Sequence, residues 1–185
     1  MEYFDIVDEA GEPTGKTVSR KEAHEKGIRH RTAHVWIIKQ TNGKTEILLQ
    51  KRSDEKDSFP GMFDTSSAGH ILAGEEPLLS ALRELQEELG VIAVPKDLTY
   101  AGTFRIQYEK VFHDRSFRDN EVAKVYVYTK PVISFTLQES EVSEVCWFDL
   151  DEVWNEICLG DRHRFCVPKE GLDVLRTWLI EAPRN

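Results

Sequence analysis

The alternation of hydrophobic and polar positions along the chain predicts a mixture of strands and helices. Runs that alternate with a period of two, or that are apolar and bounded by turn residues, predict strands at residues 3–8, 32–40, 46–51, 98–108, 122–129 and 142–148. Helical spacing and end signals predict a short helix between Ser19 and Gly27, and helices at residues 77–89, 150–157 and 168–180. Asn42-Gly43 predicts a hairpin. Because strands and helices are interspersed, we expect an α/β sandwich with helices on both sides of a mixed sheet.

The helix at residues 77–89 has two distinct faces. Its apolar stripe, which we expect to face the core, consists of Leu78, Leu82, Leu85 and Leu89. Away from that stripe lie Glu84, Glu87 and Glu88, whose i, i+3, i+4 spacing makes their carboxylates neighbours. Like charges at this spacing destabilise a helix by roughly 0.2–0.5 kcal/mol per pair, and the negative end of the helix dipole adds to the repulsion. Local conflicts of this kind are typical of functional sites.

A divalent cation would resolve the conflict among the three glutamates. Carboxylate oxygens suit Mg²⁺ or Mn²⁺, and Mg²⁺ is usually held by a few carboxylates together with waters and substrate phosphates. The alternative is an acidic helix face that is simply solvated.

Composition and charge narrow the range of partners. The 185 residues include 24 basic and 33 acidic side chains, and the net charge of −9 argues against a nucleic-acid polymer or an anionic membrane as partner. No apolar run approaches the ~20 residues of a membrane span, and the acidic N-terminus lacks the features of a signal peptide. Cys146, Cys158 and Cys166 fit no zinc pattern, so we expect reduced thiols. We therefore expect a single cytoplasmic domain over residues 1–185.

The segment 69–91 carries a motif that surrounds the acidic helix. It matches the pattern Gx5Ex7REUxEExGU, with U aliphatic, at every fixed position, beginning at Gly69 and including Gly90. In this motif the chain resembles the Nudix superfamily. The resemblance implies a loop–helix–loop within an α/β/α sandwich that has a mixed sheet. It also implies a hydrolase that uses Mg²⁺ or Mn²⁺ to cleave a nucleoside diphosphate linked to another moiety, or another organic diphosphate.

The same resemblance implies roles for the residues of the motif. Glu84, Glu87 and Glu88 would be metal ligands, and one of them would also serve as the general base. Glu75 would support the loop or the metal, and Arg83 would orient the glutamates through a salt bridge. Gly69 and Gly90 would be required by the local geometry of the backbone.

A closer resemblance, over roughly residues 3 to 130, is to the isopentenyl-diphosphate isomerase branch of the superfamily. The segments that carry it are Thr14-Gly15, Ala23-His24, His30-Arg31, Lys51-Arg52-Ser53, Lys56, Phe59-Pro60-Gly61, Ser67-Ala68-Gly69-His70 and Asp119-Asn120-Glu121-Val122. The metal ligands of that isomerase fall on His24, His30, His70, Asp119 and Glu121. Its diphosphate-binding basic pair falls on Arg52 and Lys56.

Two departures distinguish this chain from the isomerase. The isomerase has a cysteine immediately before the Gly-His pair, where this chain has Ala68, and a proton-transfer isomerisation cannot proceed normally without that group. The isomerase also has a degraded Nudix motif, whereas this chain keeps every glutamate. We therefore expect a hydrolase on an isomerase-like framework. The alternatives are a prenyl-diphosphate isomerase and a non-catalytic binding module.

Several assignments stay open at the level of sequence. The His24, His30 and His70 set either holds a second metal ion or shapes the pocket through hydrogen bonds, and the basic pair either contacts phosphate or lies on the surface. His34, in an apolar strand, is expected to be structural. Glu139, Glu141 and Glu144 are expected in a polar loop, although Nudix enzymes often place an additional catalytic glutamate there. The organic half of the substrate is undetermined. So is the oligomeric state, for which a homodimer is our working expectation.

Overall fold

The protein is described by a computed structural model that covers residues 1–160 and 164–182. These residues form a seven-stranded sheet of β3 (His30–Thr41), β4 (Lys44–Arg52), β5 (Phe63–Asp64), β6 (Ser67–His70), β7 (Leu98–Phe112), β8 (Arg115–Tyr128) and β9 (Val142–Asp149). The strand order is β5-β4-β3-β8-β7, with β6 pairing with β3 and β9 with β4. The β3–β8 pair is parallel and the other pairs are antiparallel, so the predicted mixed sheet is confirmed.

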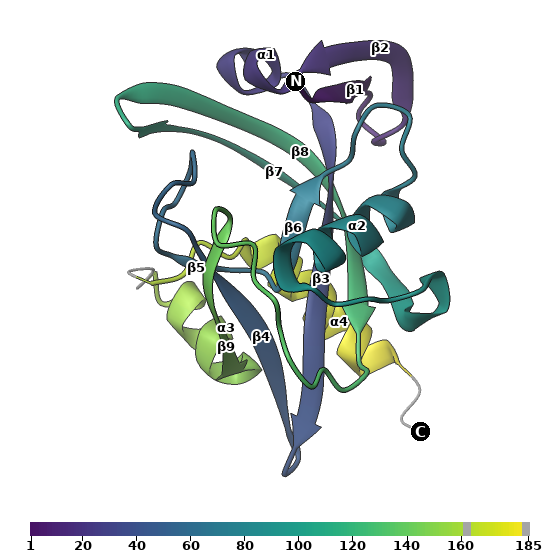
Figure 1. Ribbon diagram of the computed structural model, residues 1–185, viewed down its shortest axis with the longest axis vertical. Coiled ribbons are helices and arrows are strands. Elements are labelled where there is room, and N and C mark those ends of the chain that lie inside the picture. The colour runs from purple at the N-terminus through teal and green to yellow at the C-terminus, as the bar shows by residue number, and fades with distance from the viewer. Residues whose placement is uncertain (161–163, 183–185) are drawn as a thin grey trace.

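Helices cover both faces of this sheet (Figure 1). On one face α2 (Pro77–Leu89) packs through Leu85 and Leu89 against inward side chains such as Val35. On the other face α3 (Leu150–Cys158) and α4 (Lys169–Glu181) pack against a cluster that contains Trp36. Successive residues of a strand point to opposite faces, so β3 supplies both layers of the core. The expected α/β/α sandwich is confirmed.

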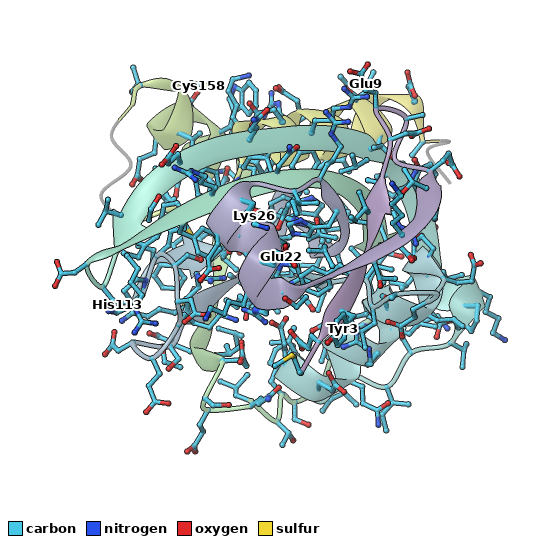
Figure 2. All side chains as sticks on the ribbon, turned by 90° about the horizontal axis from the view of Figure 1, so that it is seen from above. Tyr3, Glu9, Glu22, Lys26, His113 and Cys158 are labelled. Atoms are coloured by element: carbon cyan, nitrogen blue, oxygen red, sulfur yellow. The ribbon has the colours of Figure 1, made fainter. Side chains whose placement is uncertain are left out.

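A separate N-terminal unit covers one end of the sheet. It consists of β1 (Tyr3–Val7), β2 (Pro13–Ser19) and α1 (Arg20–Lys26), and Figure 2 shows α1, with Glu22 and Lys26 labelled, lying over that end. The predicted capping box begins α1, because the Ser19 side chain accepts a hydrogen bond from the Glu22 N–H. Phe4, which is fully buried, anchors the unit.

The elements differ from the prediction mainly where local patterning is weak. The helix at 77–89 is confirmed at both ends, and α1, α3 and α4 agree within one or two residues. Three strands were not predicted: β2 is mostly exposed, and β5 and β6 are too short to alternate. The β7–β8 hairpin is also longer than predicted, and its tip extends well beyond the other strands of the sheet (Figure 1). Among the described residues no helix is both long and apolar enough to cross a membrane.

Candidate functional site

A cavity of about 590 Å³ lies beneath the N-terminal unit, next to α2 and the start of β3. Its lining brings together two sets of side chains that lie far apart in the sequence. The first set comes from α2 and consists of Glu84, Glu87 and Glu88. The second set surrounds the beginning of β3 and contains His24, His70, Asp119 and Glu121, with His30 buried behind them.

The three glutamates of α2 occupy different environments despite their regular spacing. The Glu88 residue is only 3% exposed, whereas the side chain of Glu87 is 53% exposed. The Glu88 carboxylate accepts hydrogen bonds from Ser67 Oγ at 2.8 Å and from the Ala68 N–H at 3.3 Å. Burial, reinforced by the charge of Glu84, raises the pKa of Glu88 to about 8. Without a cation beside it, Glu88 therefore keeps its proton at neutral pH.

Gly69 allows the backbone of β6 to approach the Glu84 carboxylate closely. A Cβ atom at position 69 would overlap the end of the Glu84 side chain, so no larger residue fits without moving it. Gly90 serves a different purpose: its φ of 69° is left-handed, and its N–H caps α2 by bonding to the Gln86 and Leu85 carbonyls. Both glycines are thus explained by backbone geometry, as the resemblance implied.

Arg83 forms ion pairs with Glu75, Glu84 and Glu87. Its guanidinium lies 3.1 Å from a Glu75 oxygen, 2.6 Å from a Glu84 oxygen and 3.1 Å from a Glu87 oxygen, and it also donates to the His70 carbonyl. Glu75 accepts hydrogen bonds from Ser80 Oγ and the Leu72 N–H, so it holds the loop before α2 as well as the arginine. This network positions Glu84 and Glu87 toward the cavity and links them to β6.

The histidine set converges from three separate elements. The ligand atoms of His24, His30, His70 and Glu121 all lie within 4.8 Å of one another. An Asp119 oxygen lies 3.7 Å from His24 Nε2 and 3.9 Å from His30 Nε2. The Nδ1 atoms of His24 and His30 each bond a backbone carbonyl, at 2.9 and 2.8 Å, which points the Nε2 atoms toward the centre. His30 Nε2 is buried and has no hydrogen-bond partner among the described residues.

Electrostatics at this set favour a bound cation. Burial lowers the pKa of all three histidines, so the imidazoles are neutral at pH 7 and can act as ligands. Burial also raises the pKa of Asp119 and Glu121, and for Glu121 the neighbouring Asp119 adds to the effect. Neutral imidazole nitrogens beside two confined carboxylates are the donor set that a divalent metal ion prefers.

The predicted basic pair borders the cavity. The Arg52 and Lys56 side chains are 12% and 15% exposed, so neither is a surface charge. All three guanidinium nitrogens of Arg52 already have partners: two donate to Ser58 and one to Asp64. Lys56 forms an ion pair with Glu141 at the cavity wall. Arg52 therefore fastens the loop over residues 53–62, and Lys56 presents its charge to the cavity.

Sequence reasoning missed or left open some of the residues that line the cavity. Of the three glutamates near residue 140, only Glu141 lines it, and Glu139 lies in the same turn as Glu141. Glu144 lies in β9, inside the strand predicted at residues 142–148, so the loop expected for it was wrong. His34 lies in the expected strand, but its side chain lines the cavity. The period of two along β3, which places His34 on the same face as His30, is the signal that could have indicated this.

Comparison with known proteins places these features in a family. A model described as the NUDIX domain matches residues 29–168. "Nudix hydrolase 3" of Arabidopsis thaliana is 47% identical over 164 residues, which cover 86% of this chain but 21% of that protein. An uncharacterised Nudix hydrolase of Clostridium acetobutylicum is 41% identical over 154 residues, covering 82% of this chain and 72% of that one. This chain thus spans about one fifth of the length of its plant relative.

The fold also resembles that of solved structures. The crystal structure of DR0079 from Deinococcus radiodurans matches with a TM-score of 0.69 and covers 95% of this chain and 98% of that one. At 18% sequence identity this similarity concerns the fold alone.

Proposed function

The chain belongs to the Nudix family, and on that premise we propose that it is a single-domain, divalent-metal-dependent hydrolase over residues 1–185. It would cleave a pyrophosphate bond in a nucleoside diphosphate derivative or in another organic diphosphate. The observation that carries the proposal is the convergence of Glu84, Glu87 and Glu88 on a cavity large enough for such a molecule. Arg83 holds the first two, and Ser67 and the Ala68 N–H hold Glu88. The test is phosphate release from a panel of organic diphosphates, with the products identified.

The glutamates fit Mg²⁺ or Mn²⁺ on the grounds of charge as well as ligand type. Like-charged carboxylates crowd one helix face, and Glu88 is so confined that it keeps a proton when no cation compensates it. When bound, a divalent ion neutralises diphosphate charge, polarises phosphorus and makes water more acidic.

The remaining steps of hydrolysis would be carried out by residues of the chain itself. Water attacks one phosphorus atom, the bond from that phosphorus to the bridging oxygen breaks, and a glutamate of the set accepts the proton of the water. Arg83 keeps Glu84 and Glu87 in place during this step through its two short contacts. Lys56 would exchange its partner Glu141 for a substrate phosphate, because the charge of a lysine suits a phosphate oxygen.

We further propose that the histidine set, with Asp119 and Glu121, holds a second divalent ion rather than only shaping the pocket. Two of the imidazoles use Nδ1 to bond backbone carbonyls, which is how metal-binding histidines are commonly oriented. The unpartnered Nε2 of His30, aimed at the centre of the set, supports the same proposal. Equilibrium dialysis against Mn²⁺ should then give more than one ion per chain, and His30→Ala should remove one of them.

A substitution at position 68 tests directly whether the protein is instead a prenyl-diphosphate isomerase. We expect Ala68→Cys to create no isomerase, because a proton donor acts only when its pKa and position match the substrate carbon, and a displacement of ~1 Å can cost ~10²-fold. Hydrolysis should fall only modestly, because the Ala68 side chain is not a ligand. The measurement follows phosphate release and deuterium incorporation from heavy water into isopentenyl diphosphate in parallel.

The unmodified protein is the control for this experiment. Robust deuterium incorporation by the wild type would overturn the hydrolase proposal, and it would mean that a residue other than a cysteine moves the proton.

A further inference from the structure

His34 lines the same cavity as the two sets of candidate ligands. It follows His30 and Thr32 on the same face of β3. Its neighbours across the sheet are Ala68 on β6 and Val125 on β8. Because Ala68 carries only a methyl group, the space beside the imidazole on that side is left to the cavity, which both residues line.

The imidazole of His34 lacks the partners that a buried polar group normally has. The residue is 6% exposed, and no hydrogen bond joins its ring to a residue that the structure describes. Neither ring nitrogen is among the fully buried unpaired side-chain atoms, so the nitrogens face the cavity that His34 lines. The ring packs edge-on against Phe104, with centroids 5.2 Å apart and an interplanar angle of 87°. A polar side chain whose nitrogens have no partner in the fold and face a cavity is available to hydrogen-bond a ligand there.

The charge state of His34 suits a hydrogen-bond donor to an anion. Burial lowers the pKa of His34 to about 4, against the opposing influence of Asp64. The ring is therefore neutral at pH 7, and one of its nitrogens carries a hydrogen. A neutral N–H can approach a phosphate oxygen without requiring a counter-charge in a cavity that is already rich in carboxylates.

The residues around His34 indicate which part of a substrate would contact the imidazole. The N–H of Ala68, its neighbour across β6, bonds to Glu88, and the next residue, Gly69, abuts Glu84. Phosphate oxygens that share a cation with these carboxylates would lie close to them. His34 thus pairs with the residue of β6 whose N–H holds Glu88, and both side chains line the cavity that the proposed function assigns to the diphosphate.

We propose that His34 contacts the substrate, with its ring N–H donating a hydrogen bond to a non-bridging oxygen of the diphosphate. The inference rests on the proposed function, because it assigns a further residue to the same diphosphate site. A purely structural role would leave diphosphate binding unchanged when the imidazole is replaced by a residue that packs equally well against Phe104.

The test uses four variants of the full chain: His34→Leu, His34→Phe, His34→Gln and His34→Asn. Binding of imidodiphosphate, which is not hydrolysed, is measured by calorimetry in excess Mg²⁺, alongside kcat and KM on whichever organic diphosphate the panel identifies. We expect His34→Leu and His34→Phe to weaken imidodiphosphate binding ~10- to 100-fold, as for a lost hydrogen bond to a charged group. Either Gln, which mimics Nε2, or Asn, which mimics Nδ1, should restore most of the binding.

Stability provides the second readout. The imidazole has no hydrogen-bond partner among the described residues, so the melting temperature of His34→Leu, measured in EDTA, should stay close to that of the wild type. Phe104→Leu is the matched control, since it removes the same ring contact but keeps the imidazole. It should lower the melting temperature while leaving imidodiphosphate binding within a few-fold of the wild type.

The outcomes separate this inference from the proposed function. Wild-type binding by both His34→Leu and His34→Phe, or an absence of imidodiphosphate binding by the wild type in excess Mg²⁺, would overturn the role of His34. If binding depends on His34 but no diphosphate of the panel is hydrolysed, the role of His34 stands and the hydrolase proposal fails.

Discussion

Hydrolysis should fall to the background rate when divalent cations are removed with EDTA, and it should return when Mg²⁺ or Mn²⁺ is added. Acidic side chains outnumber basic ones in the lining of the cavity, so without cations a diphosphate would be repelled. Arg83 is a single counter-ion that Glu75, Glu84 and Glu87 share, which leaves this group a net negative charge. The measurement is phosphate release before chelation, after it and after each metal is restored. Activity that survives exhaustive chelation would rule out the proposed mechanism.

The same cations should stabilise the fold. A ligand that binds only the native state contributes about 2.7 kcal/mol at a concentration 100-fold above its Kd. For a chain of this size that stabilisation corresponds to a rise in melting temperature of roughly 5–10 °C. Thermal unfolding with and without Mg²⁺ checks this, and Na⁺ at matched ionic strength controls for simple screening.

Replacement of Glu88 by glutamine should lower kcat by about 10²- to 10⁴-fold, the range expected for loss of a general base or of a transition-state charge contact. The amide keeps the shape of the side chain and can still accept the hydrogen bonds from Ser67 and the Ala68 N–H, so the fold should persist. Glu87→Gln should also lower kcat by orders of magnitude. Glu76→Gln, at an exposed residue just before α2, is the matched control and should retain wild-type turnover.

Glu88→Gln should also change the pH dependence of stability in EDTA. The pKa of Glu88 is raised from an ordinary 4.5 to about 8 by burial and by Glu84. Between these two values the unfolded chain releases the proton and the native state retains it, so metal-free wild type loses stability as the pH rises through that window. Glutamine does not titrate, and the melting temperature of the variant should fall less between pH 5 and 8. Identical pH profiles together with wild-type turnover would contradict both the raised pKa of Glu88 and its role in hydrolysis.

Some of the fold and of the site is determined by short stretches of sequence. The helix at 77–89 was predicted to the residue, because Pro77 begins it and Gly90, with a φ of 69°, ends it. The Asn42-Gly43 turn joins β3 and β4 because both residues adopt positive φ angles, which these residue types tolerate. The carboxylate cluster follows from helical periodicity alone, since residues at i, i+3 and i+4 must share a face. In each case the cause lies within a few neighbouring residues.

The environments of the site residues were decided only by the tertiary structure. Spacing treats Glu87 and Glu88 alike, yet packing against β6 buries Glu88 and leaves Glu87 half exposed. His24, His30 and His70 meet only because the N-terminal unit, β3 and β6 converge, and pairing with β6 and β8 directs His34 into the cavity. Burial, pKa and hydrogen-bond partners arise from contacts between segments far apart in the chain. Local sequence patterns therefore specified which chemistry the residues could carry, and long-range packing decided which of them share one cavity.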